Sequence, residues 1–139
     1  MARDLIHEAV KTSLIRDGWK VTNDPYKIEL VEDGRYLEAD LGAEKIIGLE
    51  KGTEKIIVEI KTFSRPSAIY QFHEALGQYL AYRVAIQEAS IERDLYLAIS
   101  TSTFDAIEQI KFISTLVNRF QLKMVIVDVV NKKVVKWIK

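Results

Sequence analysis

Glu59 and Lys61 are the residues whose types and spacing most clearly suggest chemistry. They place a carboxylate and an ammonium group two residues apart in the stretch VEIKTFSRPS, residues 58–67. Alternate side chains of a strand share a face, so Glu59 and Lys61 are expected to point to the same side as Ile57. Asp40 ends an earlier predicted strand, 36–41. If the two strands are neighbours in one sheet, Asp40, Glu59 and Lys61 can converge on one surface.

Such a trio suits a Mg²⁺ or Mn²⁺ site, because hard cations prefer oxygen ligands and Mg²⁺ is usually held by carboxylates together with substrate phosphates. Asp40 and Glu59 would supply the carboxylates, and the main-chain carbonyl of Ile60 would add a third protein ligand. Lys61 would orient the attacking water or stabilise the transition state of a phosphodiester hydrolysis. The alternative is an amphipathic strand whose charged face only meets solvent.

The bulk composition describes a folded protein of one domain. The chain has 139 residues, of which 48% are hydrophobic and 29% charged, and it has no cysteine, which excludes a disulfide framework or a thiolate metal site. Lys plus Arg equals Asp plus Glu, so the formal net charge is zero, which argues against tight DNA binding by the chain alone. Since no apolar run reaches about 18 residues, we expect a cytoplasmic protein that does not enter a membrane.

The hydrophobic periodicity predicts an α/β fold of the mixed α+β type. We expect a helix over 4–16 and an extended segment over 19–22, followed by strands over 26–31, 36–41, 44–50 and 55–63. A long helix over 66–89 and a strand over 94–100 follow. The segment 103–120 is predicted helical, with a break near its middle left open, and strands over 123–130 and 133–138 form a C-terminal hairpin. Helices would flank a central mixed sheet.

The order helix, Asp at a strand end, hairpin, Glu-x-Lys strand, helix and strand resembles the PD-(D/E)xK nuclease superfamily, the restriction-endonuclease-like fold with an αβββαβ core. The resemblance covers about residues 3–101 and makes 102–139 a peripheral helix and hairpin of one domain, 1–139. One departure is that Ala39, rather than proline, precedes Asp40.

The same resemblance implies roles for further residues. Glu8 stands where many members carry an acid that reaches the metal or its waters, and Gln78 and Tyr82 resemble a Gln-x-x-x-Tyr element near substrate. Arg65 and Ser67 would bind substrate at a helix N-terminus beside the catalytic strand. Without the resemblance, Glu8 reads as an ordinary exposed helix residue, and Gln78 and Tyr82 as residues that fill a boundary between sheet and helix.

The whole chain is similar to the XisH family of fdxN-element excision controlling factors from cyanobacteria. The stretches that carry this similarity are RDLIHEAVKTSLIRDGWKVTNDP, LEADLGAEK, VEIKTF and FHEALGQYLAYR. It implies a role in the programmed excision of a DNA element, alongside a site-specific recombinase and a small companion protein, XisI.

Two functions therefore compete. In the first, the chain is a Mg²⁺-dependent DNA endonuclease with Asp40, Glu59 and Lys61 as its site, supported by Glu8 and Gln78. In the second, it is a non-catalytic accessory factor that keeps the nuclease fold and binds DNA, the recombinase or the companion protein. Cutting both strands of a duplex usually needs two sites, so we also expect a homodimer.

Overall fold

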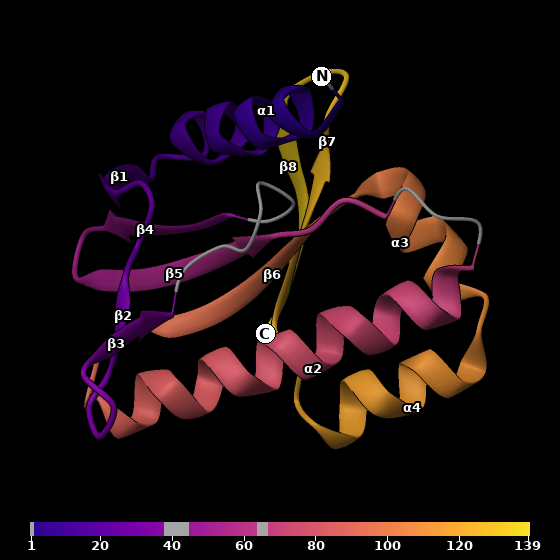
Figure 1. Ribbon diagram of the computed structural model, residues 1–139. Coiled ribbons are helices and arrows are strands. Elements are labelled where there is room, and N and C mark those ends of the chain that lie inside the picture. The colour runs from indigo at the N-terminus through magenta and orange to yellow at the C-terminus, as the bar shows by residue number, and fades with distance from the viewer. Residues whose placement is uncertain (1, 38–44, 64–66) are drawn as a thin grey trace.

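The computed structural model describes residues 2–37, 45–63 and 67–139 (Figure 1). Its helices are α1 (Ala2–Arg16), α2 (Ala68–Glu88), α3 (Thr101–Glu108) and α4 (Lys111–Arg119). Its strands are β1 (Lys20–Asn23), β2 (Ile28–Leu30), β3 (Arg35–Leu37), β4 (Lys45–Lys51), β5 (Glu54–Ile60), β6 (Asp94–Ser100), β7 (Met124–Asp128) and β8 (Lys133–Ile138).

The described residues form a mixed six-stranded sheet in the order β1-β4-β5-β6-β7-β8. β5 and β6 run parallel, as do β6 and β7, and the outer pairings β1–β4, β4–β5 and β7–β8 are antiparallel. The parallel pairing of β5 with β6 requires a crossover, which α2 supplies. The predicted mixed α/β class is therefore confirmed.

Helices cover both faces of this sheet, as Figure 1 shows with α1 on one side and α2 on the other. On the α1 side, Val10 and Leu14 pack with the β5 residues Ile56, Val58 and Ile60. The other core unites α2, α3 and α4 with the opposite face; its largest buried members include Phe72, Tyr79, Ile57, Leu97 and Ile99. Because both faces are covered, the central strands are apolar at almost every position. In the described ranges, no helix is long and apolar enough to cross a membrane.

The chain departs from the predicted organisation in two places. Among the described residues, β2 and β3 pair only with each other, as a separate two-stranded sheet in which Ile28 lies opposite Leu37. Ile28 is fully buried and Leu37 partly buried in the α2 core, so this hairpin packs on the helix instead of extending the main sheet. The segment 102–139, expected to be peripheral, supplies β7 and β8 of the main sheet, and four consecutive β7 residues are buried.

Two predicted boundaries have clear local causes. Gly18 ends α1 with φ +98°, and Gly52 forms the β4–β5 turn with φ +62°, backbone conformations that glycine adopts without a steric penalty. The segment 103–120 is indeed divided, because α3 ends at Glu108 and α4 begins at Lys111. Ser100 caps α3 directly from the end of β6, its hydroxyl accepting a hydrogen bond from the Thr103 N–H at 3.2 Å.

Gly48→Ala is expected to destabilise the protein by about 1–3 kcal/mol. A Cβ at this buried strand position would lie 2.7 Å from the Tyr26 ring and 2.8 Å from the Arg93 guanidinium group, so both must move. Gly77→Ala is the matched control: nothing lies within 4 Å of its added Cβ in α2, and a gain of about 0.5–1 kcal/mol is expected. Urea denaturation measures the free energy of unfolding of both variants. Equal values for Gly48→Ala and Gly77→Ala would contradict the prediction.

Candidate functional site at the end of strand β5

Glu59 lies in the middle of the sheet with its side chain directed to the α2 layer. It alternates with Ile57, which belongs to the α2 core, whereas Ile56, Val58 and Ile60 belong to the α1 core. Glu59 pairs in register with Ile46 of β4 and Leu97 of β6, and its side chain is 0% exposed. Strand periodicity predicts this face correctly, but burial of the carboxylate comes from the covering helix.

Lys61 follows directly after β5 and stays attached to the sheet. Its N–H donates to the Ala98 carbonyl at 3.1 Å, and its side chain is only 8% exposed. The alternative of a charged strand face that simply meets solvent is therefore wrong for Glu59 and Lys61. Burying ionisable groups costs free energy, and proteins tolerate that cost most often at functional sites.

The third member of the expected trio, Asp40, lies outside the described residues, and so does Arg65. The expected pairing of strand 36–41 with the Glu59 strand is wrong for the described residues, because β3 pairs with β2 whereas β5 pairs with β4 and β6. Convergence of Asp40 itself on Glu59 and Lys61 stays a prediction. Within the described part of the chain, no group of three or more His, Asp or Glu side chains could hold a metal ion. Of the oxygen ligands expected for such an ion, the Glu59 carboxylate and the Ile60 carbonyl belong to described residues. Their chemistry fits Mg²⁺ or Mn²⁺, provided that Asp40 completes the set.

Glutamine side chains on α2 add a polar stripe at the edge of its buried face. Gln71 and Gln78 are seven residues apart, two helical turns, and each is half-buried. Each has a buried Oε1 atom without a hydrogen-bond partner among the described residues. Tyr82, one turn beyond Gln78, is buried in the α2 core. The Gln-x-x-x-Tyr pattern predicted Gln78 and Tyr82. Gln71 was not predicted, although its seven-residue spacing from Gln78 is a usable signal.

Glu8 and Ser67 occupy different surroundings. Glu8 is exposed on α1, the helix that covers the face opposite to the one that Glu59 faces. Ser67 is the N-cap of α2, and its hydroxyl accepts a hydrogen bond from the Tyr70 N–H at 3.5 Å. A serine in this position has a structural role as well as the substrate-binding role expected for it.

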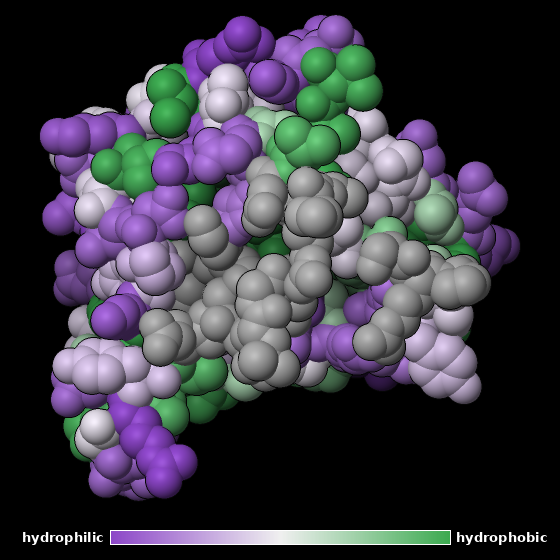
Figure 2. Space-filling model, turned by 45° about the horizontal axis from the view of Figure 1, so that its top comes forward, coloured by the Kyte–Doolittle hydropathy of each residue, from purple (hydrophilic) through white to green (hydrophobic). Residues whose placement is uncertain are grey.

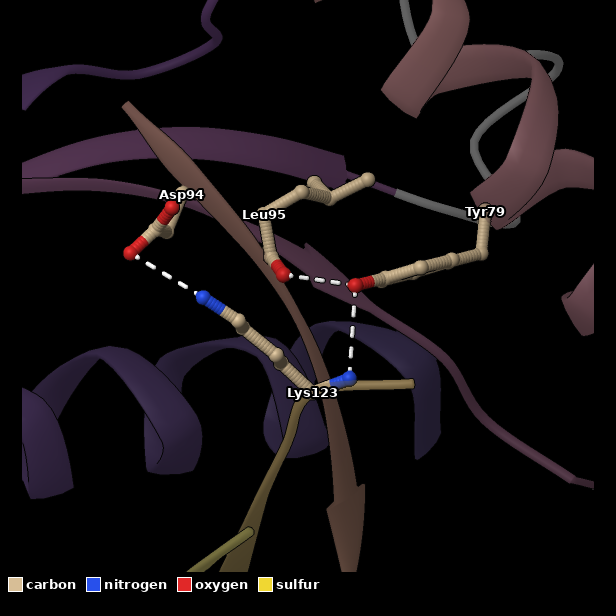
Figure 3. A network of polar contacts seen from close by, with 4 residues as sticks. All are labelled: Tyr79, Asp94, Leu95 and Lys123. Atoms are coloured by element: carbon tan, nitrogen blue, oxygen red, sulfur yellow. Dashed lines mark hydrogen bonds and ion pairs between the residues drawn. The ribbon is translucent and has the colours of Figure 1, made fainter. Parts of the chain in front are cut away.

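A second polar network, centred on Tyr79 of α2, was not expected from the sequence (Figure 3). The Tyr79 hydroxyl donates to the Leu95 carbonyl at 2.9 Å and accepts from the backbone N–H of Lys123 at 3.3 Å. The Lys123 ammonium group forms an ion pair with Asp94 at 3.2 Å. The network joins α2 to the beginnings of β6 and β7, and it fixes the helix over the face that carries Glu59.

This network borders a cleft of about 920 Å³, which lies at the C-terminal half of α2. Arg83 and Arg93 also line it, stacked on the rings of Tyr79 and Tyr26, and both donate to backbone carbonyls: Arg83 to Phe120 at 2.7 Å and Arg93 to Ile56 at 3.1 Å. The first bond ties α2 to the end of α4, and the second ties the segment before β6 to β5, so we read the arginines as structural.

Tyr79→Phe is expected to cost about 1–2 kcal/mol, because it leaves the Leu95 carbonyl and the Lys123 N–H without their shared partner. Tyr36→Phe is the control, since that tyrosine is 59% exposed on the hairpin and should change stability by less than about 0.5 kcal/mol. Urea denaturation monitored by circular dichroism measures both values. Equal stability of the two variants would show that the bridge contributes nothing.

The same residue makes stability depend on alkaline pH. Burial raises the pKa of the Tyr79 hydroxyl. The Lys123 N–H and the Arg83 guanidinium group partly offset this rise in pKa, and the Glu59 charge adds a smaller increase. The folded state holds this proton more tightly than the unfolded state, so its stabilisation is complete below about pH 10 and is lost as pH rises through the raised pKa. Burial also raises the pKa of Tyr96 to about 12, so Tyr79→Phe should remove only part of the alkaline loss.

Comparisons with known proteins agree with this architecture. The sequence matches the family described as XisH protein over residues 1–135. A crystal structure of an XisH family protein from Nostoc punctiforme PCC 73102 is 40% identical, with a TM-score of 0.86, and the match covers 98% of this chain and 100% of that one. An fdxN element excision controlling factor protein from Anabaena variabilis is 37% identical, with a TM-score of 0.86 and coverage of 98% and 99%. None of the curated proteins searched matches. The chain therefore belongs to the XisH family.

Proposed function

We propose that the protein acts in the excision of a DNA element as a Mg²⁺-dependent endonuclease-like factor with its site at the end of β5. The observation that carries this proposal is the burial of Glu59 in β5 and of Lys61 directly after it, 0% and 8% exposed. The Anabaena variabilis relative is described as an excision controlling factor for the fdxN element, which supports DNA recombination as the setting.

Each side chain has a separate task in this proposal. Glu59, together with Asp40 and the Ile60 carbonyl, would hold the cation, which when bound activates a water and neutralises charge on the scissile phosphate. Lys61 stabilises the negative charge that develops on the phosphate oxygens, and its low exposure keeps that interaction in a medium of low dielectric constant. The hydrogen-bond donors of Gln78 would position the phosphate or its attacking water.

Further contacts with DNA are proposed at the beginning of α2. Arg65 precedes the helix, Ser67 caps it, and the first N–H groups of an α-helix attract phosphate. With zero formal net charge, the chain has no excess of cations to bind DNA tightly by itself. We therefore include the recombinase, the companion protein XisI and a second copy of the chain as partners that would deliver or share the DNA.

The second candidate is an accessory factor that keeps the nuclease fold without cutting. The zero net charge favours it, and so does the relative from Anabaena variabilis, an excision controlling factor. Retention of two buried ionisable residues argues against it, since a pure scaffold gains nothing from groups that are costly to bury.

Cleavage assays separate the two candidates. The purified protein is expected to nick or cut supercoiled plasmid or branched DNA with Mg²⁺ or Mn²⁺, and to lose that activity completely with excess EDTA. A positive result requires that added metal restore cleavage after EDTA. No cleavage with either metal, in the presence of the companion protein and recombinase, would favour the accessory function, particularly if the three proteins co-purify.

A further inference from the structure

An apolar groove of about 560 Å³ lies between the β2–β3 hairpin and the C-terminal half of α2. Its apolar lining comes from both elements and includes Leu30, Val31, Leu37, Leu80, Val84 and Ala85. In Figure 2 hydrophobic and hydrophilic side chains lie side by side at the lower left, where Figure 1 places this hairpin. The groove lies on the half of α2 away from Ser67, so it is separate from the site at the end of β5.

Part of this apolar lining is open to solvent. Val31 is 59% exposed and Val84 54% exposed, whereas Leu30, Leu37 and Leu80 are partly buried against the α2 core. The groove therefore has a packed floor and exposed walls. Contiguous apolar surface of this kind in a soluble domain commonly marks a site of interaction.

The rim of the groove carries charge of one sign only. Its acidic residues are Glu29, Glu32, Asp33 and Glu88, and none of the described residues that line it is basic. Arg35 lies opposite Leu30 in the hairpin but is exposed and does not line the groove. Acidic and basic residues are equally numerous in the chain, 20 each, so a purely acidic rim is a local arrangement. Such a rim repels nucleic acid and attracts a basic partner.

The helical wall suits another helix. Leu80 and Val84 form one ridge four residues apart, and Ala81 and Ala85 form a shallow row beside it. Ridges at this spacing accept the side chains of a second helix, and the small alanines allow a close approach. The acidic residue Glu88 lies one turn further on, where it can meet a basic side chain of that helix.

We propose that this groove binds an amphipathic helix of a partner protein, with apolar residues inserted between hairpin and α2 and with Lys or Arg residues at the acidic rim. This is the helix-in-groove mode of recognition, in which apolar anchors are spaced by three and four residues. The proposal goes beyond the DNA site and does not depend on it, because its test contains neither DNA nor metal.

The test uses a synthetic helical peptide with Leu at positions i, i+3, i+4 and i+7, flanked by Lys and Arg and labelled for fluorescence anisotropy. The protein is expected to bind it, and to bind a peptide of the same apolar pattern with Glu in place of Lys and Arg at least about tenfold more weakly. Raising the salt concentration should reduce the difference in affinity between the two peptides, because salt screens exposed charges.

Matched variants locate the binding. Val84→Glu is expected to weaken binding about tenfold or more, whereas Val135→Glu, at an equally exposed valine (54%) on β8, should leave it unchanged. Glu88→Lys should weaken binding of the basic peptide, and Glu108→Lys, at the end of α3, should not. Equal binding of both peptides, or equal effects of Val84→Glu and Val135→Glu, would overturn the proposal. Self-association in sedimentation experiments that Val84→Glu abolishes would also overturn it and make a second copy the occupant.

Discussion

Glu59→Gln is expected to lower metal-dependent DNA cleavage by a factor of about 10³ or more, the loss typical when a group that binds or stabilises the reacting centre is removed. The substitution keeps the volume and planarity of the side chain, which matters because this position is 0% exposed. What it removes is the negative charge that would hold the divalent cation. Single-turnover cleavage of plasmid DNA in Mg²⁺ and in Mn²⁺ measures the effect.

Glu54→Gln is the matched control for this experiment, because Glu54 begins the same strand and is exposed. It should cleave at the wild-type rate. Thermal unfolding of both variants verifies that Glu59→Gln remains folded, so that loss of activity is not loss of structure. A Glu59→Gln protein that cuts as fast as wild type would exclude a catalytic site on β5 and leave the accessory function.

Phe72→Ala is expected to cause the largest loss of stability, about 3–5 kcal/mol. Phe72 is fully buried where α2 packs on the sheet, and truncation to alanine leaves a cavity that the surrounding strands can only partly fill. Since domains have a total stability of about 5–15 kcal/mol, this one change removes much of it. Urea denaturation provides the free energy of unfolding.

Phe112→Ala serves as its counterpart on the surface. Phe112 lies on α4 and is 54% exposed, so its truncation should change stability by less than about 0.5 kcal/mol. If the two variants lose similar free energy, α2 does not contribute to the core as its burial indicates. α2 also carries Gln78. If DNA cleavage by Phe72→Ala falls in proportion to its folded fraction, stability and activity are linked through the position of α2.

The local parts of this fold could be predicted from the sequence. Asp17-Gly18 ends the first helix, Lys51-Gly52 turns the β4–β5 hairpin, and the apolar run 94–100 matches β6, because each depends on neighbouring residues alone. The orientation of Glu59 toward the same face as Ile57 likewise follows from the two-residue period of a strand.

What the sequence could not provide depends on contacts between distant segments. Burial of Glu59 requires α2 to lie across β5, and the separate pairing of β2 with β3 results from packing of Ile28 and Leu37 on that helix. The Tyr79 bridge joins residues 16 and 44 positions apart. The periodicity of one segment does not predict its contacts with a distant segment. These features could therefore be recognised only in the three-dimensional structure.

The first helix of this protein is held by the last part of the chain, which bears on how the protein folds during synthesis. The Arg16 guanidinium group donates to the carbonyls of Asn131 and Lys132 at 3.1 and 3.2 Å, and the rings of Trp19 and Trp137 lie 5.7 Å apart. A ribosome must therefore have synthesised the chain past residue 137 before α1 and Trp19 can make these contacts. Until then the apolar side of α1 is open to chaperones, and nascent chains truncated before residue 131 should be much more sensitive to protease than a chain of residues 1–139.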